Sequence, residues 1–344
     1  MRRRMNSKTG NGAYTPGRPV YIVGYGSAAG EKESKGPFGA FFDYCAKDDR
    51  MNMKSFELAE THFTEKAVAA ALKRSGRSLD GIDALLGGDL MNQCTATSYF
   101  ARSVGRPFIG LFNACATMAE AMALSAMLVG GGGFENVLAA ASSHFCTAER
   151  QFRFPLEYGG QRSPAAQWTV TASGAAVISS EPSESAAEIA GVYFGKVRDL
   201  GIKDASNMGA AMAPAFCDTL ECYLEDTKTV PSDYDLIVSG DLGAVGAGIV
   251  KEIFDKKGVP LGDVYNDCGL LIFDREKDDV HAGGSGCGCS AAVLCAKILP
   301  DMLSGSIKRA LFIGTGALMS PMLVMQKESI PGIAHLIELR QARL

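Results

Sequence analysis

Short apolar runs alternate with segments of helical periodicity along the first half of the chain. Between Phe56 and Lys73, apolar side chains recur at helical spacing, which predicts a helix that stops at Gly76. A second helix is expected over residues 114–128. Short apolar or β-branched runs predict strands at 20–23, 83–86, 137–141 and 175–179. Helices that alternate with buried strands are typical of an α/β protein.

The second half of the chain repeats this order. A helical segment at 208–224 precedes a strand at 236–238. That strand is followed by Gly-Asp-Leu around Asp241, and the strand at 83–86 is followed by the same three residues around Asp89. The two aspartates therefore end equivalent strands, where they either cap the following turns or line a site.

Two cysteines mark the next feature that the halves share. A long helix begins after Cys115 and another begins after Cys289. The following strand starts 22 residues after each cysteine, at Val137 and at Leu311. The same order with one identical spacing indicates an internal duplication. Because its period is about half the chain, the duplication predicts two fused, similar halves rather than a solenoid.

The boundaries of these halves follow from composition. Residues 1–17 are polar and rich in glycine, and the polar stretch 180–185 contains Pro182. We therefore expect a flexible tail over 1–17, an N-terminal half over 18–185 and a C-terminal half over 186–344.

Composition excludes several classes of protein. A chain of 344 residues that is 47% hydrophobic and 21% charged can bury a sizeable core and is not disordered. The net charge of −4, with basic residues scattered after the first four, argues against a nucleic-acid partner. No apolar segment follows the basic start, so we expect an intracellular protein whose ten cysteines are reduced. The apolar stretch 114–133 contains Glu120 and ends in four glycines, which predicts a buried helix rather than a membrane span.

Cys115 stands where an apolar run ends and a helix rich in Ala and Met begins. A helix start carries partial positive charge and unpaired N–H groups, which lower the pKa of a thiol and can hold an oxyanion or a carboxylate. The sequence Asn113-Ala114-Cys115-Ala116-Thr117 therefore predicts a reactive or ligand-binding cysteine. The alternative is a buried cysteine that only packs.

A glycine-rich loop occupies the equivalent position in the second half. Four glycines within residues 281–292 let the backbone approach a ligand closely, or else form a tight connection without a ligand. The duplication makes Cys289 the counterpart of Cys115, so the two helix starts should meet near a pseudo-twofold axis. The candidate ligand-binding residues of this loop are Gly284, Ser285, Gly286, Cys287, Gly288 and Cys289.

The sequence does not favour a metal or nucleotide site. Cys287 and Cys289 have no second cysteine pair or spaced histidine pair to complete a zinc site. The glycines of 24–30 resemble a dinucleotide fingerprint, but their spacing is off by one and a charged, proline-containing segment follows. His144, after the strand at 137–141, either points at the same site as Cys115 or is structural.

Together these features resemble the thiolase superfamily over nearly the whole chain. Residues 20–26 resemble the first strand of that family, and residues 171–177 resemble its small-residue segment near the end of the first half. The resemblance implies a five-layered αβαβα fold built from two similar halves, and a homodimer packed through first-half strands.

The sequence departs from the catalytic members of the superfamily, which use cysteine, histidine and asparagine. Cys115 matches the nucleophile, but residues 238–243 carry no histidine and residues 287–290 replace the segment that supplies the asparagine. His281, upstream in the same loop, is a tentative catalytic candidate without a motif match. The missing pair argues against condensation. An acyltransferase that uses Cys115 as the acyl acceptor, with His281 or His144 as base, is the alternative function.

One branch of the superfamily, a stage V sporulation family of endospore-forming bacteria, is more similar. The similarity lies in residues 87–94, 113–118, 265–269 and 281–292. It implies binding of dipicolinic acid (pyridine-2,6-dicarboxylate) and a part in its uptake into the developing spore, with membrane proteins of the same operon as partners. It also implies a location at the inner spore membrane, on its cytoplasmic side. No cofactor is expected beyond calcium, which dipicolinate chelates.

Dipicolinate carries a carboxylate at each end of a twofold-symmetric molecule. Two helix starts related by a pseudo-twofold axis offer two anion sites. We therefore expect the start near Cys115 and the start near Cys289 to receive one carboxylate each. Besides the loop residues, the expected ligand-binding set comprises Asn113, Cys115, Ala116, Thr117, Asp89 and His144.

Overall fold

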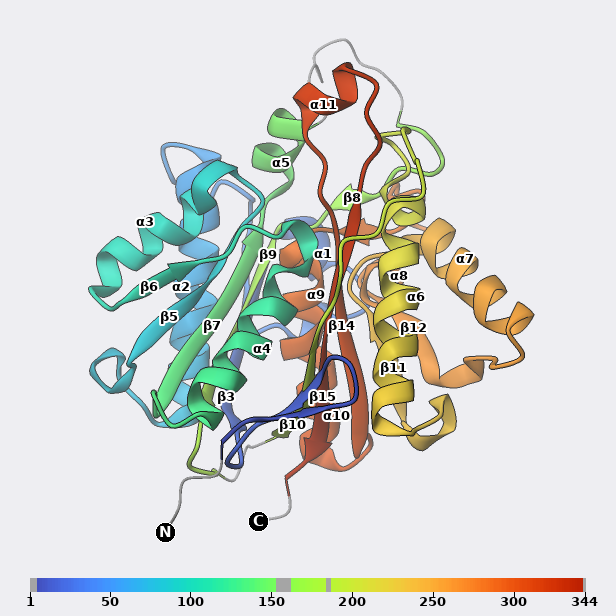
Figure 1. Ribbon diagram of the computed structural model, residues 1–344. Coiled ribbons are helices and arrows are strands. Elements are labelled where there is room, and N and C mark those ends of the chain that lie inside the picture. The colour runs from blue at the N-terminus through green and yellow to red at the C-terminus, as the bar shows by residue number, and fades with distance from the viewer. Residues whose placement is uncertain (1–4, 153–161, 184–186, 343–344) are drawn as a thin grey trace.

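Each half of the chain contributes one continuous half of the main sheet (Figure 1). First-half strands lie in the order β3-β9-β7-β5-β6, with the bounds Tyr21–Ala29, Ala172–Ser179, Asn136–Ser143, Ala84–Gly88 and Phe108–Gly110. Second-half strands lie in the matching order β10-β15-β14-β11-β12, with the bounds Ala187–Phe194, Gly332–Gln341, Arg309–Ala317, Leu236–Ser239 and Tyr265–Asp267. The two series meet where β3 pairs antiparallel with β10. This matching order confirms the duplication read from the sequence.

The computed structural model describes residues 5–152, 162–183 and 187–342. The expected boundary between the halves, at 185, lies outside these residues.

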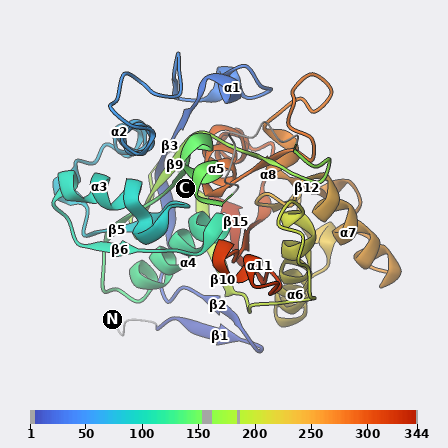
Figure 2. The ribbon, with the colours of Figure 1, turned by 90° about the horizontal axis from the view of Figure 1, so that it is seen from above.

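Helices complete a five-layered αβαβα arrangement. Helices α2 (Phe56–Ser75) and α3 (Thr95–Val104) cover the outer face of the first half-sheet. Helices α6 (Met208–Thr227) and α7 (Gly243–Lys256) lie on the opposite side, against the second half-sheet (Figure 2). Between the half-sheets run α4 (Thr117–Gly130) and a second helix made of α9, η8 and α10 (Cys287–Val293, Leu294–Ile298 and Leu299–Ser304).

The two central helices are mostly apolar around their circumference, as expected for helices that strands cover on both faces. The side chains of Met118 and Met122 in α4 are fully buried, as expected for 114–133. Residues Cys287–Ser304 are long and apolar enough to cross a membrane, but most of this helix is buried in the core of the fold. Its central turn, Leu294–Ile298, is π-helical.

Two glycines let the central helices start against strands of the opposite half. A Cβ on Gly288, at the start of α9, would overlap the carbonyl oxygen of Ala172 in β9. A Cβ on Gly316, in β14, would lie 2.8 Å from the carbonyl oxygen of Asn113. The absence of a side chain at these positions brings both helix starts to the edge of the sheet where β7 and β14 end and β9 begins.

Within the tail that the sequence predicted to be flexible, residues 7–15 form regular structure. Strands β1 (Ser7–Thr9) and β2 (Ala13–Thr15) form a hairpin, and β2 also pairs with β10. The carboxylate of Asp226 accepts the backbone N–H groups of residues 11–13 at 2.7–2.9 Å. This correction has a non-local cause, because the carboxylate that holds the polar segment comes from the end of α6.

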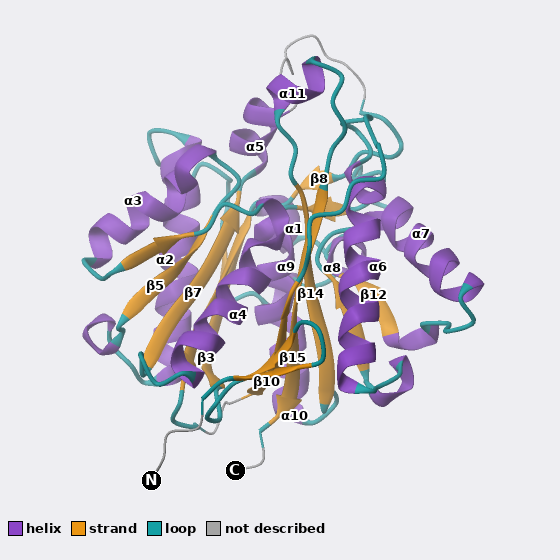
Figure 3. Ribbon diagram, viewed as in Figure 1, coloured by secondary structure: helices purple, strands orange, loops and turns teal. Residues whose placement is uncertain are grey.

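The remaining elements are short. Figure 3 shows them with the longer ones, helices in purple and strands in orange. They are α1 (Glu31–Ser34), β4 (Tyr44–Cys45), α5 (Phe145–Phe152), β8 (Trp168–Thr169), α8 (Cys268–Leu271), β13 (Gly284–Ser285), α11 (Pro321–Met325) and the single turns η1 (Gly39–Phe41), η2 (Leu79–Gly81), η3 (Asn92–Cys94), η4 (Ala114–Ala116), η6 (Pro231–Asp233) and η7 (Gly262–Val264). All ten cysteines are free thiols, as expected.

Candidate functional site

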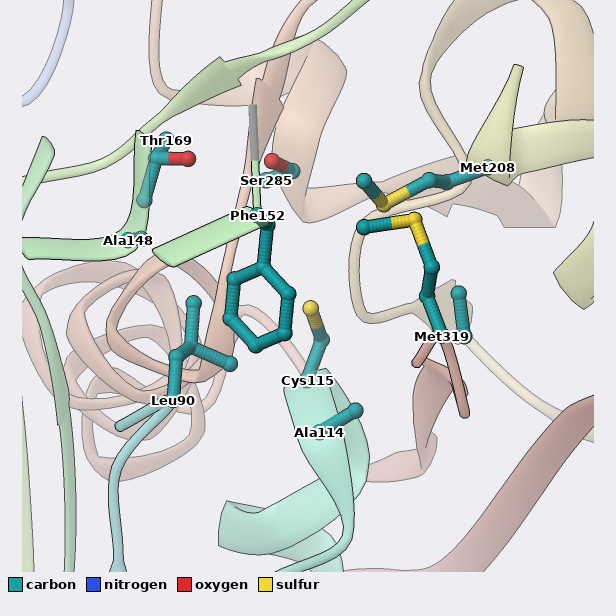
Figure 4. A pocket seen from close by; sticks show the side chains of 10 residues that line it. Leu90, Ala114, Cys115, Ala148, Phe152, Thr169, Met208, Ser285 and Met319 are labelled. Atoms are coloured by element: carbon teal, nitrogen blue, oxygen red, sulfur yellow. The ribbon is translucent and has the colours of Figure 1, made fainter. Parts of the chain in front are cut away.

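A cavity of about 410 Å³ lies where the first central helix begins, at the carboxyl ends of β5 and β14 (Figure 4). Its wall is mostly apolar, and its side-chain polar atoms are a thiol and two hydroxyls. The lining residues are Leu90, Ala114, Cys115, Ala148, Phe152, Thr169, Met208, Ser285, Ala317 and Met319.

The cavity opens into a larger groove beneath α11. The groove has a volume of about 1060 Å³ and shares Leu90, Phe152 and Met319 with the cavity. It continues along Phe112 and Met322, which are both exposed. Helices α5 and α11 lie close together above this opening, at the end of the molecule opposite both termini (Figure 1). A small molecule therefore has a path from solvent to Cys115.

Cys115 lies in the turn η4 that leads into α4, and its side chain points into the cavity (Figure 4). The preceding Ala114 has φ of +49°, a left-handed conformation that residues other than glycine rarely adopt. Such strain is concentrated at functional sites, because surrounding structure must hold it in place. The position of Cys115 is the one that the sequence predicted.

The acid–base group that contacts Cys115 is the carboxyl of Asp241. The side chains of Asp241 and Cys115 are hydrogen-bonded. Asp241 Oδ2 also accepts the Gly286 N–H at 2.8 Å, and Oδ1 accepts the Thr315 hydroxyl at 2.9 Å. Burial raises the pKa of Asp241 to about 7, against the opposing effect of these hydrogen bonds. Asp241 follows β11 in the chain. This is the segment where the resemblance to the thiolase superfamily implied a histidine.

The Cys115 thiol is not activated by its helix start, contrary to the sequence-based expectation. Burial raises its pKa well above the usual value, and the charge of Asp241 raises the pKa further. The Gly286 N–H lowers the pKa but does not offset these two effects. At neutral pH Cys115 is a protonated thiol, which is a poor nucleophile.

Groups of the protein itself occupy the start of α9. Gly286 has φ of +108° and directs its N–H to Asp241, while Gly288 donates its N–H to the Ser143 hydroxyl at 3.1 Å. The thiol of Cys287 donates to the carbonyl of Ser142 at 2.9 Å. A ligand carboxylate could take the expected anion position near Cys289 only by displacing Asp241. Of the loop residues Gly284 to Cys289, Ser285 lines the cavity.

Asp89 caps a helix rather than lining the cavity. Its carboxylate accepts the N–H groups of Met91 and Thr97 at 3.0 and 2.8 Å, and the Thr97 hydroxyl at 2.8 Å. It is the counterpart of Asp241 in the duplicated order. The sequence left open whether these aspartates cap turns or reach the site. Asp89 caps a helix, and Asp241 contacts Cys115.

The two histidines proposed from the sequence lie away from Cys115. His144 Nε2 donates to the carbonyl of Asp49 at 2.8 Å, and its ring packs against Phe56. His281 Nδ1 lies 3.0 Å from the carbonyl oxygen of Ser163, and its Nε2 lies 2.9 Å from a carboxylate oxygen of Asp279. Neither histidine lines the cavity. The contacts that both make are structural.

Asn113, Ala116 and Thr117 shape the turn beneath Cys115. The Thr117 hydroxyl donates to the Ala114 carbonyl at 2.8 Å, and the Ala116 N–H donates to the Asn113 carbonyl at 3.1 Å. The Asn113 amide lies 2.7 Å from Nε2 of His335, a residue of β15 that the sequence did not single out. Burial lowers the pKa of His335 to about 4, so its ring is neutral. No local signal predicts this contact, because β15 comes from the far end of the chain.

Two hydroxyls face the cavity from a pair of short strands. Thr169 of β8 lies opposite Ser285 of β13 in a parallel pair, and both residues line the cavity across from Cys115 (Figure 4). The neighbouring Trp168 stacks on Phe145 with ring centroids 3.9 Å apart, and Lys32 lies 4.2 Å from the Trp168 ring centroid. The Thr169 hydroxyl therefore lies beside a packed aromatic pair.

Comparison with known sequences identifies relatives over nearly the full length. Residues 11–340 match the family model described as stage V sporulation protein AD. The chain is 46% identical over 327 residues to stage V sporulation protein AD of Bacillus subtilis strain 168, a match that covers 95% of this chain and 96% of the relative.

Comparison with solved structures identifies the fold. 3-Oxoacyl-[acyl-carrier-protein] synthase III from Aquifex aeolicus is 10% identical with a TM-score of 0.55, covering 93% of this chain and 99% of that chain. Cerulenin-bound OleA from Xanthomonas campestris is 13% identical with a TM-score of 0.60, covering 94% and 99%. The fold is therefore thiolase-like, as the sequence predicted.

Proposed function

Because the chain belongs to the stage V sporulation protein AD family and so has a role in sporulation, we propose that it binds dipicolinic acid during uptake of this compound into the developing spore. The observation that carries the proposal is the Cys115 cavity, which combines an apolar wall, an aromatic ring and two hydroxyls. The apolar wall and the ring suit the flat face of dipicolinate, and the hydroxyls suit its carboxylates.

The wall of the cavity suits a pyridine ring. The phenyl ring of Phe152 lines one side, and the thioethers of Met208 and Met319 lie together on another side (Figure 4). Aromatic rings and thioether sulfurs both make favourable contacts with an aromatic ligand. The Ser285 hydroxyl supplies a hydrogen-bond donor for a carboxylate. The Thr169 hydroxyl donates to Glu149 Oε1 at 3.3 Å and would turn from it to the ligand.

The chemistry around Cys115 favours binding over acyl transfer. A cysteine acyl acceptor needs a base that generates the thiolate. Here the hydrogen-bonded neighbour is the carboxyl of Asp241, which raises the pKa of the thiol. Among the described residues, no histidine lines the cavity.

Calorimetric titration with dipicolinate tests the proposal. Thr169→Val preserves the shape of the wall but removes a hydroxyl, and we expect it to weaken binding by about tenfold. Ser103→Ala removes an exposed hydroxyl of α3 and serves as the control, for which we expect unchanged affinity. Absence of measurable binding by the unaltered protein would refute the proposal.

The acyltransferase alternative has its own test. The protein is incubated with acetyl-CoA or malonyl-CoA, and an adduct is sought by intact mass, with Cys115→Ala as the control. A stoichiometric adduct that forms at catalytic rates and is absent from the control would establish this alternative and exclude a pure binding role.

The proposal includes calcium only as an ion bound to dipicolinate. No cluster of three or more His, Cys, Asp or Glu side chains suited to a metal occurs among the described residues. We propose that calcium, if it participates, is chelated by dipicolinate. Titrations with and without calcium chloride distinguish the free acid from its calcium complex as the preferred ligand.

We propose a homodimer through the edge of the first half-sheet. Strand β6 is the last strand of the sheet and pairs with β5 on one side, and Ile109 in β6 is exposed. Ile109→Lys should convert a dimer to a monomer in light scattering, whereas Val259→Lys, on the other half, should not. We also propose that the chain acts with membrane proteins of the same operon at the cytoplasmic side of the inner spore membrane.

A further inference from the structure

The carboxyl of Asp241 is buried directly behind the ligand cavity without a cationic partner. Its three hydrogen-bond donors are the Gly286 N–H, the Thr315 hydroxyl and the Cys115 thiol, which are all neutral. No lysine, arginine or histidine of the described chain lines the cavity or hydrogen-bonds to Asp241. The negative charge of Asp241 therefore has no counter-ion at this site.

The other titratable groups that face Asp241 do not relieve this charge. Asp267, the last residue of β12, is a second buried carboxyl whose charge raises the pKa of Asp241. Four thiols also face it, and all are buried, with a pKa that burial raises: Cys115 from η4, Cys268 from α8, and Cys287 and Cys289 from α9. These thiols are uncharged at neutral pH.

Asp241 accepts a proton more readily than Asp267 does. Asp267 accepts hydrogen bonds from the Ser239 hydroxyl at 2.6 Å and from the N–H groups of Leu242, Gly243 and Leu270 at 2.7, 3.0 and 3.1 Å. These four donors stabilise its ionised form. Asp241 has three donors, and one of them is a thiol, which is a weak donor.

A ligand carboxylate in the cavity would place a second negative charge near Asp241, separated from it by the side chain of Cys115. Like charges at close range disfavour ionisation of both groups. On the basis of the proposed function, we infer that Asp241 couples ligand capture to protonation: its carboxylate takes up one proton from solvent when an anionic ligand enters the Cys115 cavity.

The proton has a defined place in this exchange. In the free protein the Cys115 thiol donates to the ionised Asp241. Once Asp241 is a neutral carboxylic acid, its new O–H donates to Cys115 Sγ, and the S–H turns toward the ligand carboxylate. No covalent bond other than the O–H of Asp241 forms. Since burial raises the pKa of Asp241 to about 7, the proton is accessible near neutral pH.

Calorimetry in two buffers of different ionisation enthalpy counts the protons taken up with dipicolinate. We expect an uptake of about 0.5 proton at pH 7 and close to one at pH 8, because free Asp241 is then mostly ionised. Affinity should fall by about tenfold per pH unit above pH 7. Asp241→Asn should bind without proton uptake. Asp89→Asn, which alters the equivalent carboxylate outside the cavity, should retain the uptake.

A second variant keeps the inference testable if Asp241→Asn does not fold. Thr315→Val removes the hydroxyl that stabilises ionised Asp241, so the uptake profile should shift to higher pH. Binding by the unaltered protein with no proton uptake, or full uptake by Asp241→Asn, would overturn this inference and leave the proposed function standing. No binding of dipicolinate at any pH would instead overturn both.

Discussion

The thiol of Cys115 and the carboxyl of Asp241 are hydrogen-bonded at the base of the cavity. In this pair, ionising one partner makes ionisation of the other more costly. The arrangement is the opposite of a cysteine–imidazolium pair, in which the positive ring stabilises the thiolate. It keeps Cys115 a protonated, weakly nucleophilic thiol at neutral pH.

This relationship predicts how fast Cys115 is alkylated. Asp241→Asn removes the neighbouring negative charge and lowers the pKa of the thiol, so labelling by iodoacetamide at pH 8 should accelerate by about tenfold. The measurement is peptide mass spectrometry after timed labelling. Cys45, an exposed thiol that does not line the cavity, should label at the same rate in both proteins. An unchanged rate at Cys115 would show that Asp241 does not control it.

The aromatic wall predicts selectivity for a flat ligand. Phe152→Leu keeps an apolar side chain but removes the ring, and we expect dipicolinate to bind about fivefold more weakly. Binding of the saturated analogue, cis-piperidine-2,6-dicarboxylate, should change little, because it has no aromatic ring to lose a contact. The exposed Phe41→Leu is the matched control. Equal losses for both ligands would contradict a ring-specific contact.

The close approach of α9 to β9 predicts a large loss of stability on adding one methyl group. Gly288→Ala would press its Cβ against the carbonyl of Ala172, and we expect a loss of about 3 kcal/mol in the free energy of unfolding. Gly248→Ala, on an open face of α7, should instead gain up to about 1 kcal/mol. Urea unfolding measures both. A neutral Gly288→Ala would mean that the helix start can move.

A buried carboxyl in the first half predicts the pH dependence of stability. Burial raises the pKa of Glu33 to about 8, so the folded protein holds this group protonated at neutral pH. An acid with a raised pKa in the folded state loses stability as pH rises from its unfolded pKa, near 4.5, to its folded pKa. Stability should therefore fall between about pH 5 and pH 8.

Glu33→Gln removes the titrating group at nearly constant shape. It should reduce this fall, to which the buried carboxyls of Glu60 and Asp241 also contribute, and raise the free energy of unfolding at pH 7.5 by roughly 2 kcal/mol. Glu31→Gln, an exposed change in the same short helix, should leave the slope as it is. Denaturant titrations across the pH range give both slopes, and an unaltered slope in Glu33→Gln would assign the pH dependence to other groups.

The fold was accessible from the sequence because its signals are local and occur twice. Each strand is a short apolar run, and the strands around Asp89 and Asp241 end in the same three residues. The ordered hairpin at the N-terminus was not accessible. Its polar sequence forms strands because a carboxylate from α6, Asp226, accepts its N–H groups.

Only part of the candidate site could be predicted from the sequence. The helix-start pattern located Cys115, and the glycine-rich loop located Ser285, which both line the cavity. The sequence could not say which of the two equivalent aspartates reaches the cysteine, because that depends on how the halves pack. It also predicted a lowered pKa for Cys115 from the helix start alone, whereas burial and Asp241 determine the outcome.

Trp168 is the only tryptophan of the chain, and it directly precedes Thr169 in the cavity wall. Its indole stacks on the ring of Phe145 and makes cation–π contacts with Lys32 and Arg162. All tryptophan fluorescence of the protein therefore arises beside the cavity. The chain carries a built-in optical reporter there, so occupancy can be followed by emission without attaching a dye.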